Sequence, residues 1–174
     1  MKRYKQSMLL KNIVIMTGVL ISVGDVYAQQ VAGWIEKAML VDDGIVLKAK
    51  LDTGADNSSL NAAGYTIVKK DGGKWASFKL TNYAGDSVDI TKRIVRFTKI
   101  KRKNLPAKRR PVIKIAICIG DVNKTVEVNL ADRSNYKYQL LIGRSFLKQS
   151  ILVDSFIKYS HEPTCKAGNA VNTQ

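Results

Sequence analysis

The stretch Leu51-Asp52-Thr53-Gly54-Ala55-Asp56 is the most informative part of this 174-residue chain. It follows an apolar run, Ile45 to Leu51, whose alternating end is typical of a strand that enters a tight turn. In such a turn Thr53 can hydrogen-bond around the backbone, and Gly54 allows backbone atoms close to the carboxylate. A carboxylate placed there can activate water if a second carboxylate shares its proton, because two adjacent carboxylates cannot both ionise. The stretch favours a catalytic Asp52, while an ordinary Asp at a strand end also fits these residues.

Short apolar runs separated by turn residues extend on both sides of this stretch. Strands are predicted at Val31 to Val41, Ile45 to Leu51, Tyr65 to Lys70, Trp75 to Thr81, Ser87 to Phe97, Val112 to Ile119, Thr125 to Leu130, Leu140 to Ile142 and Ile151 to Ile157. One or two helical turns are expected at Ser145 to Gln149. No long segment after residue 28 has helical periodicity, so the pattern does not support a Rossmann fold or a helical bundle. The spacing predicts an all-β domain, closed or sandwich-like.

The first 28 residues are typical of a secretory signal. A basic start precedes the uncharged apolar run Ile13 to Val23, and Val26-Tyr27-Ala28 places small residues where a signal peptidase cuts. Because the apolar run is about half of the roughly 20 residues that a membrane-spanning helix needs, we expect cleavage after Ala28 rather than an anchor. The sequence therefore predicts an exported, periplasmic protein with a domain at 29–159 and a polar, frayed tail at 160–174.

The chain is strongly basic, with a formal net charge of +15, and removal of residues 1–28 would leave +12 over 146 residues. Ten basic residues and no acidic ones lie between Lys92 and Arg110. This segment is either a solvated loop or an electrostatic guide for acidic peptides, anionic envelope polymers or a membrane surface. Phe97 is its only aromatic residue, so no stacking platform is evident, and together with export this argues against nucleic acid as a partner.

The cysteines and the single histidine limit the redox and metal chemistry. Cys118 lies in the apolar run Ile115 to Ile119 and Cys165 in the polar tail, so an oxidising compartment permits one disulfide, which the sequence leaves open. His161 is the only histidine, and there is no HExxH motif. One His with two scattered Cys is a poor zinc set, so we expect neither a metal nor a cofactor.

Together with motifs further along the chain, the stretch around Asp52 resembles the retropepsin-like aspartic proteases. Retroviral members carry a similar Leu-Asp-Thr-Gly-Ala-Asp segment and an apolar-apolar-Gly-Arg segment that opens a short helix, here Leu141-Ile142-Gly143-Arg144. A bacterial branch formerly labelled ATP-dependent zinc proteases is more similar still. It matches at Gly33 to Glu36, Lys48 to Ala55, Arg110 to Ile113, Leu141 to Arg144 and Val153-Asp154, so the resemblance spans Val31 to Lys158. Asp56 departs from this branch, where the position is usually basic, and follows the retroviral pattern instead.

The resemblance implies a single-lobe acid-protease fold, a closed β-barrel with one short C-terminal helix. It assigns catalytic roles to Asp52, Thr53 and Gly54, and supporting roles to Ala55, Asp56, Gly143 and Arg144. Because the chain has one Asp-Thr-Gly, the second carboxylate has to come from another copy, so we expect a homodimer. Asp56 and Arg144 are expected to form an ion pair beside the active site. Ala55 cannot donate a hydrogen bond as Ser or Thr would, so activity is expected to persist towards neutral pH.

Retropepsins close a β-hairpin flap over the substrate, and Trp75 to Phe97 is the hairpin expected to do so here. Its predicted tip is Asn82, Tyr83, Ala84, Gly85 and Asp86. The basic segment lies on or just after this hairpin, and the bacterial branch includes members found beside glutamate ligases, so acidic peptides are the implied substrates. The predicted function is an exported aspartic endopeptidase. The alternative is a non-catalytic exported module that binds anionic envelope polymers.

Overall fold

The computed structural model describes residues 29–102, 105–166 and 171–172. The predicted signal segment, 1–28, lies outside the described residues. No helix in the described part is long and apolar enough to cross a membrane. The described residues form eleven strands and one short helix, which confirms the all-β prediction. The elements are β1 (Gln30–Leu40), β2 (Ile45–Leu51), β3 (Ser58–Asn61), β4 (Thr66–Lys70), β5 (Gly73–Thr81), β6 (Ser87–Arg102), β7 (Leu105–Ile119), β8 (Val122–Ala131), β9 (Leu140–Ile142), α1 (Arg144–Leu147), β10 (Ile151–Lys158) and β11 (Val171–Asn172).

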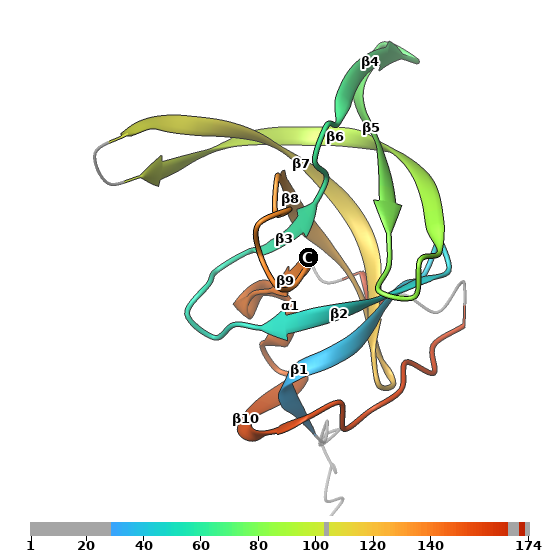
Figure 1. The fold of residues 1–174 in the computed structure, drawn as a ribbon, viewed down its shortest axis with the longest axis vertical. Coiled ribbons are helices and arrows are strands. Elements are labelled where there is room, and N and C mark those ends of the chain that lie inside the picture. Colours follow the sequence, from blue (N-terminus) through green and yellow to red (C-terminus); the bar gives the residue numbers. More distant parts are fainter. Residues whose placement is uncertain (1–28, 103–104, 167–170, 173–174) are drawn as a thin grey trace, which may run out of the picture.

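The strands close into a ring (Figure 1). They are hydrogen-bonded in the order β10-β1-β2-β9-β3-β8-β7-β6-β5-β4, and β1 also pairs with β7 through Met39 opposite Cys118 and Leu40 opposite Ile117. This additional pairing joins β1, β2, β9, β3, β8 and β7 into a closed circuit. The other strands of the order extend from it, with β10 on one edge and β6, β5 and β4 on the other. The ring is the closure that the predicted fold requires.

The core fills the inside of this ring. Because successive side chains of a strand point to opposite faces, every second residue of a ring strand is turned inward, and these inward residues are mostly apolar. Fully buried examples come from six of the strands, namely Leu40, Leu47, Leu60, Ile115, Leu130 and Leu140. Phe146 of α1 is also fully buried and packs into the same cluster. The core therefore fixes β2, β9 and the start of α1 relative to one another, and the predicted site residues at 52–56 and 143–144 follow directly after β2 and β9.

The segment after β10 is tied to the ring, so the prediction of a frayed tail is wrong for residues 160–166. Glu36 on β1 is completely buried, and its carboxylate accepts hydrogen bonds from the backbone N–H groups of Gly33 and Ser160, at 2.6 and 3.0 Å. A disulfide joins Cys165 to Cys118 of β7, which settles the question that the sequence left open. This segment is held in place because the buried Glu36 carboxylate needs hydrogen-bond donors and the segment supplies them.

The described residues of the basic segment form strands, where a solvated loop was one of the two expectations. β6 and β7 continue through it as paired strands, from Ile94 opposite Ile113 to Arg102 opposite Leu105. We call residues 96–102 and 105–110 of this hairpin the basic arm, and in Figure 1 it projects to the left, away from the ring. Within it Lys99 lies opposite Arg109, although like charges facing each other across strands repel. The Arg109 guanidinium lies over the Phe97 ring, 4.2 Å from its centroid, which gives one of these cations a partner.

Candidate active site

Asp52 lies immediately after the end of β2, in the position that the sequence predicted. Its backbone N–H donates to the carbonyl of Ile142 in β9 at 2.8 Å, and its own carbonyl accepts from the N–H of Ala55 at 3.2 Å. The Gly54 N–H donates to Asp52 Oδ1 at 3.0 Å. A Cβ at position 54 would lie 3.2 Å from the same Oδ1, so glycine leaves the carboxylate its room. The Asp52 side chain is 28% exposed, with Lys50 Nζ 3.7 Å from Oδ2. The turn therefore presents an oriented carboxylate that solvent can reach.

The Gly143-Arg144 motif packs directly against this turn, although it lies far along the chain. The N–H of Arg144 donates to the carbonyl of Ala55 at 2.8 Å, and the N–H of Ser145 donates to the carbonyl of Asp56 at 2.9 Å. A Cβ on Gly143 would fall 2.7 Å from the backbone of Asn57. Only glycine allows this close approach, which explains the residue type at that position.

The predicted ion pair between Asp56 and Arg144 is confirmed. One guanidinium nitrogen of Arg144 contacts the Asp56 carboxylate, and another donates to the carbonyl of Thr53 at 2.7 Å. Both side chains are well exposed, 77% for Asp56 and 49% for Arg144. Arg144 therefore bridges the two ends of the turn that holds Asp52.

We expect a small but measurable coupling between these two charges. Because the pair is exposed, a double-mutant cycle of Asp56→Asn and Arg144→Gln should give a coupling of roughly 0.2–1 kcal/mol in the free energy of unfolding. Urea denaturation of the four proteins measures it. A coupling of zero would mean that the two charges act independently and that the hydrogen bond to Thr53 alone fixes Arg144.

A pocket of about 240 Å³ lies beside the turn. Asp56 and Asn57 form one side of it, and β6, β7 and β8 form the others. On β6 the lining residues are Arg96, Thr98 and Ile100, which belong to the basic arm. The arm is therefore the hairpin that borders the Asp52 turn.

The predicted flap tip does not approach Asp52, and the flap prediction needs correction. β5 and β6 do form the predicted hairpin, with Thr81 opposite Ser87. However, its tip at residues 82–86 shares a shallow pocket with residues 43–46, and Tyr83 lies under Lys48 Nζ at 4.4 Å. These partners lie at the start and middle of β2, whereas Asp52 follows its end. The reason is that β6 continues well beyond Phe97, so that its far half, paired with β7, is the part that reaches the turn.

Two arginines near the turn were not predicted from the sequence. Arg133 is 9% exposed; its Nε donates to the carbonyl of Tyr138 at 3.2 Å, and its guanidinium lies 4.6 Å from the ring centroid of Tyr136. Burial lowers the pKa of Arg133 and the nearby Arg110 guanidinium lowers it further, while the Asp52 carboxylate acts in the opposite direction. Arg110 Nη1 donates to Asn129 Oδ1 at 3.1 Å, and its buried Nε has no hydrogen-bond partner among the described residues.

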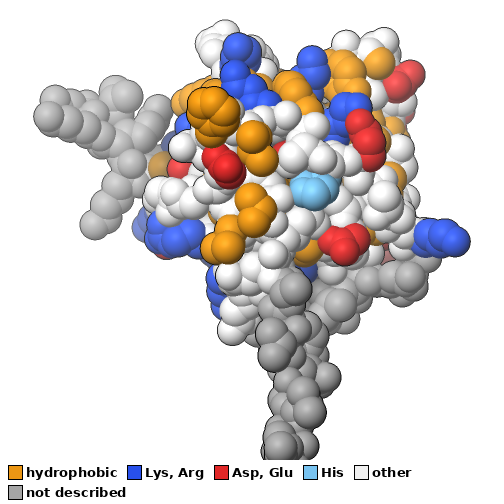
Figure 2. Space-filling model, turned by 90° about the horizontal axis from the view of Figure 1, so that it is seen from below, with side chains coloured by type: hydrophobic (Ala, Val, Ile, Leu, Met, Phe, Trp, Pro, Cys, Tyr) orange, Lys and Arg blue, Asp and Glu red, His pale blue; other side chains and the backbone are white. Residues whose placement is uncertain are grey.

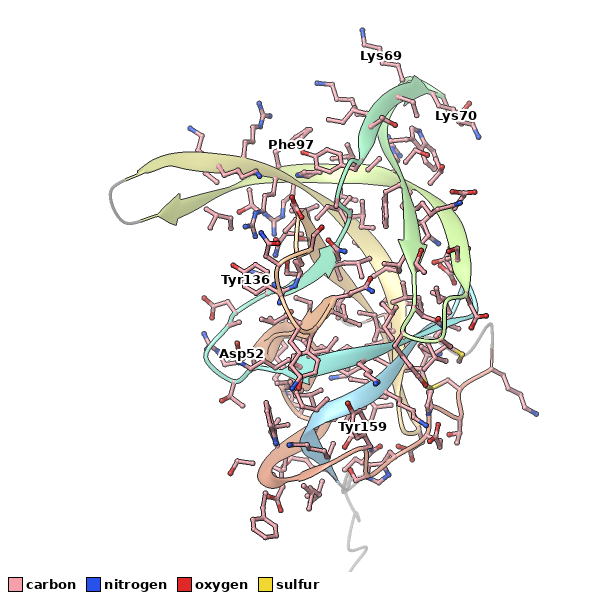
Figure 3. The ribbon with its side chains drawn as sticks, in the orientation of Figure 1. Asp52, Lys69, Lys70, Phe97, Tyr136 and Tyr159 are labelled. Atoms are coloured by element: carbon pink, nitrogen blue, oxygen red, sulfur yellow. A yellow bond between two sulfur atoms is a disulfide. The ribbon has the colours of Figure 1, made fainter. Side chains whose placement is uncertain are left out.

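The sequence contains a signal for one of the site residues that were not predicted, but not for the others. Lys50 lies two residues before Asp52. Because successive side chains of an extended chain point to opposite faces, the sequence alone predicts that both lie on the same face. Asn129 carries no such local signal, because β8 brings it to the turn only through its pairing with β3. The same holds for Arg133, which follows two residues after the end of β8. Figure 3 shows Asp52 at the turn and Phe97 on the arm above it. Within the described residues, no group of three or more His, Cys, Asp or Glu side chains is placed to hold a metal ion.

An all-β ring with an Asp-Thr-Gly turn braced by a Gly-Arg loop defines a retropepsin-like protein. The chain belongs to the RimB-like family, whose model, described as retropepsin-like aspartic endopeptidase RimB, matches residues 31–164. It is also similar to proteins named probable alpha-L-glutamate ligase, at 32% identity in Shewanella pealeana and 31% in Shewanella halifaxensis. Each match covers 62% of this chain and 24% of the relative, so the chain spans about a quarter of the length of these curated relatives. A solved structure from Legionella pneumophila, of unknown function, is 32% identical with a TM-score of 0.66, covering 76% of this chain and 98% of that one.

Proposed function

We propose that this chain is an exported aspartic endopeptidase that works as a homodimer, with Asp52 of each copy supplying one carboxylate. The observation that carries the proposal is the Asp52 turn, in which a partly exposed carboxylate is oriented by the Gly54 N–H and braced by Arg144. The sequence holds a single Asp-Thr-Gly, so the shared-proton chemistry needs a second copy. The Cys118–Cys165 disulfide is in keeping with an oxidising compartment outside the cytoplasm.

In this mechanism the two Asp52 carboxylates hold one proton and a water molecule between them. The ionised carboxylate takes a proton from the water molecule while the oxygen of that water attacks the carbon of the scissile carbonyl. The protonated carboxyl donates its proton to the carbonyl oxygen, so a neutral tetrahedral intermediate forms. The carboxyl that took the water's proton passes that proton to the amine nitrogen, and the C–N bond breaks. A hydroxyl group of the intermediate gives its proton to the other carboxylate as the new carboxylic acid forms, so the pair again holds one proton.

The charge around the turn favours acidic peptides as substrates. The basic arm borders the pocket beside Asp56, and the buried Arg133 interacts electrostatically with the Asp52 carboxylate. An anionic chain drawn along the arm would pass the turn, because clefts lined by one sign of charge attract the opposite sign. The relatives named probable alpha-L-glutamate ligase make glutamate-containing chains a reasonable choice of probe.

We expect wild-type protein to cleave a glutamate-rich peptide at least about tenfold faster than its glutamine counterpart at low salt. The difference should shrink as salt is added, since exposed charges are screened. The variant Lys108→Glu/Arg109→Glu on the arm should lose most of this preference. Initial rates measured by mass spectrometry between pH 4 and 8 test this.

The matched control is Lys69→Glu/Lys70→Glu, which makes the same change in net charge on the exposed β4–β5 hairpin (Figure 3). It should keep the preference for the glutamate-rich peptide. Equal losses in both variants would show that net charge, and not the arm, sets the preference. Tight binding of the acidic peptide without any cleavage would favour the non-catalytic binding module.

A further inference from the structure

Arg133, beside the Asp52 turn, is held firmly in place but has no carboxylate partner. It is 9% exposed; its backbone N–H donates to Asn61 Oδ1 at 2.8 Å, and its Nε donates to the carbonyl of Tyr138 at 3.2 Å. Its guanidinium also lies 4.6 Å from the ring centroid of Tyr136. All of these partners are neutral, and no ion pair among the described residues includes Arg133. Because a buried charge is costly unless it is paired, Arg133 calls for an anion.

Arg110 on β7 is a second arginine of the same kind. Its Nη1 donates to Asn129 Oδ1 at 3.1 Å, and the Asn129 amide is itself anchored, since its Nδ2 donates to the carbonyl of Ser58 at 2.7 Å. The Nε of Arg110 is buried and has no hydrogen-bond partner among the described residues. No ion pair in this part of the chain includes Arg110 either. Arg110 has therefore lost water along one edge without gaining a counterion.

The sheet brings these two arginines together next to the Asp52 turn. β7 and β8 are antiparallel, and their register places Arg110 level with Ala131, two residues before Arg133. Burial lowers the pKa of Arg133, and Arg110 lowers it further, as expected of two cations at short range. Asp52 acts on Arg133 in the opposite direction, so the pair is also within electrostatic reach of that carboxylate. In Figure 3 Tyr136, whose ring lies against the Arg133 guanidinium, is seen just above Asp52.

Asp52 cannot neutralise this region. In the proposed mechanism the two copies of Asp52 share one proton, so together they carry a single negative charge. Each copy brings Lys50, Arg110 and Arg133 to the region, and Lys50 Nζ lies 3.7 Å from Asp52 Oδ2. Elsewhere the charges are better balanced: on the face seen from below, acidic and basic side chains are interspersed (Figure 2). The surroundings of Asp52 therefore have an excess of positive charge that a bound peptide can offset.

We propose that Arg110 and Arg133 form a subsite that binds a carboxylate of the peptide close to the scissile bond. Guanidinium groups suit this ligand, because their planar N–H forks match the two oxygens of a carboxylate. The pocket beside the turn leads to the pair, since it is lined both by Asp56 and by Asn129, which holds Arg110. The carboxylate belongs either to an acidic side chain or to the C-terminus of the peptide. This inference rests on the proposed function, because it adds a subsite to that same reaction.

Peptide binding to an inactive protein tests the subsite without requiring cleavage. Asp52→Asn protein is titrated in a calorimeter with a glutamate-rich peptide, acetylated and amidated at its ends, and with the glutamine counterpart. Adding Arg133→Gln should weaken binding of the glutamate-rich peptide at least about tenfold, because hydrogen bonds to a charged group are lost. Binding of the glutamine peptide should not change. Arg110→Gln should act in the same direction, and since Arg110 is less buried, this variant tests the subsite with less risk to the fold.

Salt separates the subsite from the basic arm. At about 0.5 M salt the screening length is only a few ångströms, so attraction by the exposed arm largely disappears. The loss caused by Arg133→Gln should persist there, because this guanidinium is 9% exposed and is screened much less. The matched control is Arg93→Gln, which removes the same charge from an exposed position on β6 opposite Trp75. The control should bind both peptides as the Asp52→Asn parent does.

Further peptides identify the source of the carboxylate. A glutamine peptide with a free C-terminus offers only the terminal carboxylate, and an amidated peptide with a single glutamate offers only a side chain. Moving that glutamate along the peptide shows which position loses its advantage in Arg133→Gln. The cleavage site of the wild type in the same peptides then gives the distance from that position to the scissile bond.

The outcomes separate this inference from the proposed function. If Arg133→Gln and Arg110→Gln weaken the binding of peptides with and without carboxylates equally, the two arginines only support the turn, and the subsite is overturned. A loss that vanishes at high salt overturns it as well. If the wild type cleaves peptides through Asp52 while neither arginine affects binding, only the subsite fails. A wild type that binds acidic peptides through both arginines but cleaves none of them overturns the peptidase proposal and supports the carboxylate site.

Discussion

Replacing Asp52 with Asn is expected to lower kcat/KM for peptide cleavage by a factor of roughly 10²–10⁴. The amide can neither take the proton from the attacking water nor share a proton with a second carboxylate. The fold should survive, because the amide oxygen can still accept the hydrogen bond that Gly54 N–H donates to Asp52 Oδ1. Cleavage of a diverse peptide library, followed by mass spectrometry, measures the loss, and a thermal melt checks the fold. The matched control is Asp71→Asn, in the exposed turn between β4 and β5, which should cleave as the wild type does.

Mixing the two proteins makes the same substitution a test of the dimer. If subunits exchange, an equal mixture of wild type and Asp52→Asn contains about one quarter wild-type dimers. Because one carboxylate cannot act alone, total activity should fall to that quarter. A fall to only one half would mean that each Asp52 works independently of the other, which would sink the two-copy mechanism.

The parts of the fold that follow from local pattern were predictable. β1, β2, β5 and β10 each show apolar alternation or a turn signal at their ends, and the predicted boundaries differ by a residue or two. β3 was missed because its four residues, Ser58–Asn61, are mostly polar and become a strand only by fitting between β8 and β9. No pattern within four residues reports such a placement, since it is made by partners far along the chain.

The basic arm shows a different kind of failure. Its charge predicted a solvated loop or an electrostatic guide, and charge does suppress strand formation in isolation. Yet the uncharged residues Ile94, Thr98 and Ile100 recur between the charged ones along β6. β7 also pairs with this part of β6, and the number of charges says nothing about that pairing. If the alternation is followed beyond Phe97 despite the charged residues, it predicts a longer β6. The expected flap then moves from residues 82–86 to the basic arm.

The turn that holds Asp52 was predictable because its constraints are local and chemical. Asp52, Gly54, Gly143 and Arg144 each do something that few residue types can do, from orienting a carboxylate to admitting a backbone at 2.7 Å. Arg110 and Arg133 were not predictable, because any surface segment of a basic chain contains arginines. Their role depends on burial and on the neighbours that the ring brings to them.

Opening the Cys118–Cys165 disulfide is expected to lower the free energy of unfolding by about 4 kcal/mol, the chain-entropy value for a loop of this length. The bridge spans a sequence separation of 47 residues. It also joins the tail to the point where the ring closes, since Cys118 lies opposite Met39 in the β1–β7 pairing. Its loss should therefore loosen both the hydrogen bonds to Glu36 and the closure of the ring.

Urea denaturation with and without dithiothreitol measures this effect. The wild type should unfold at a clearly lower urea concentration when reduced, because the unfolded chain gains the freedom that the bridge removed. The control is Cys118→Ala/Cys165→Ala, which should match the reduced wild type and show no response to dithiothreitol. A wild-type midpoint that is the same in both buffers would mean that the Glu36 hydrogen bonds and the β1–β7 pairing hold the tail without the bridge. The disulfide would then have no part in closing the ring that positions Asp52.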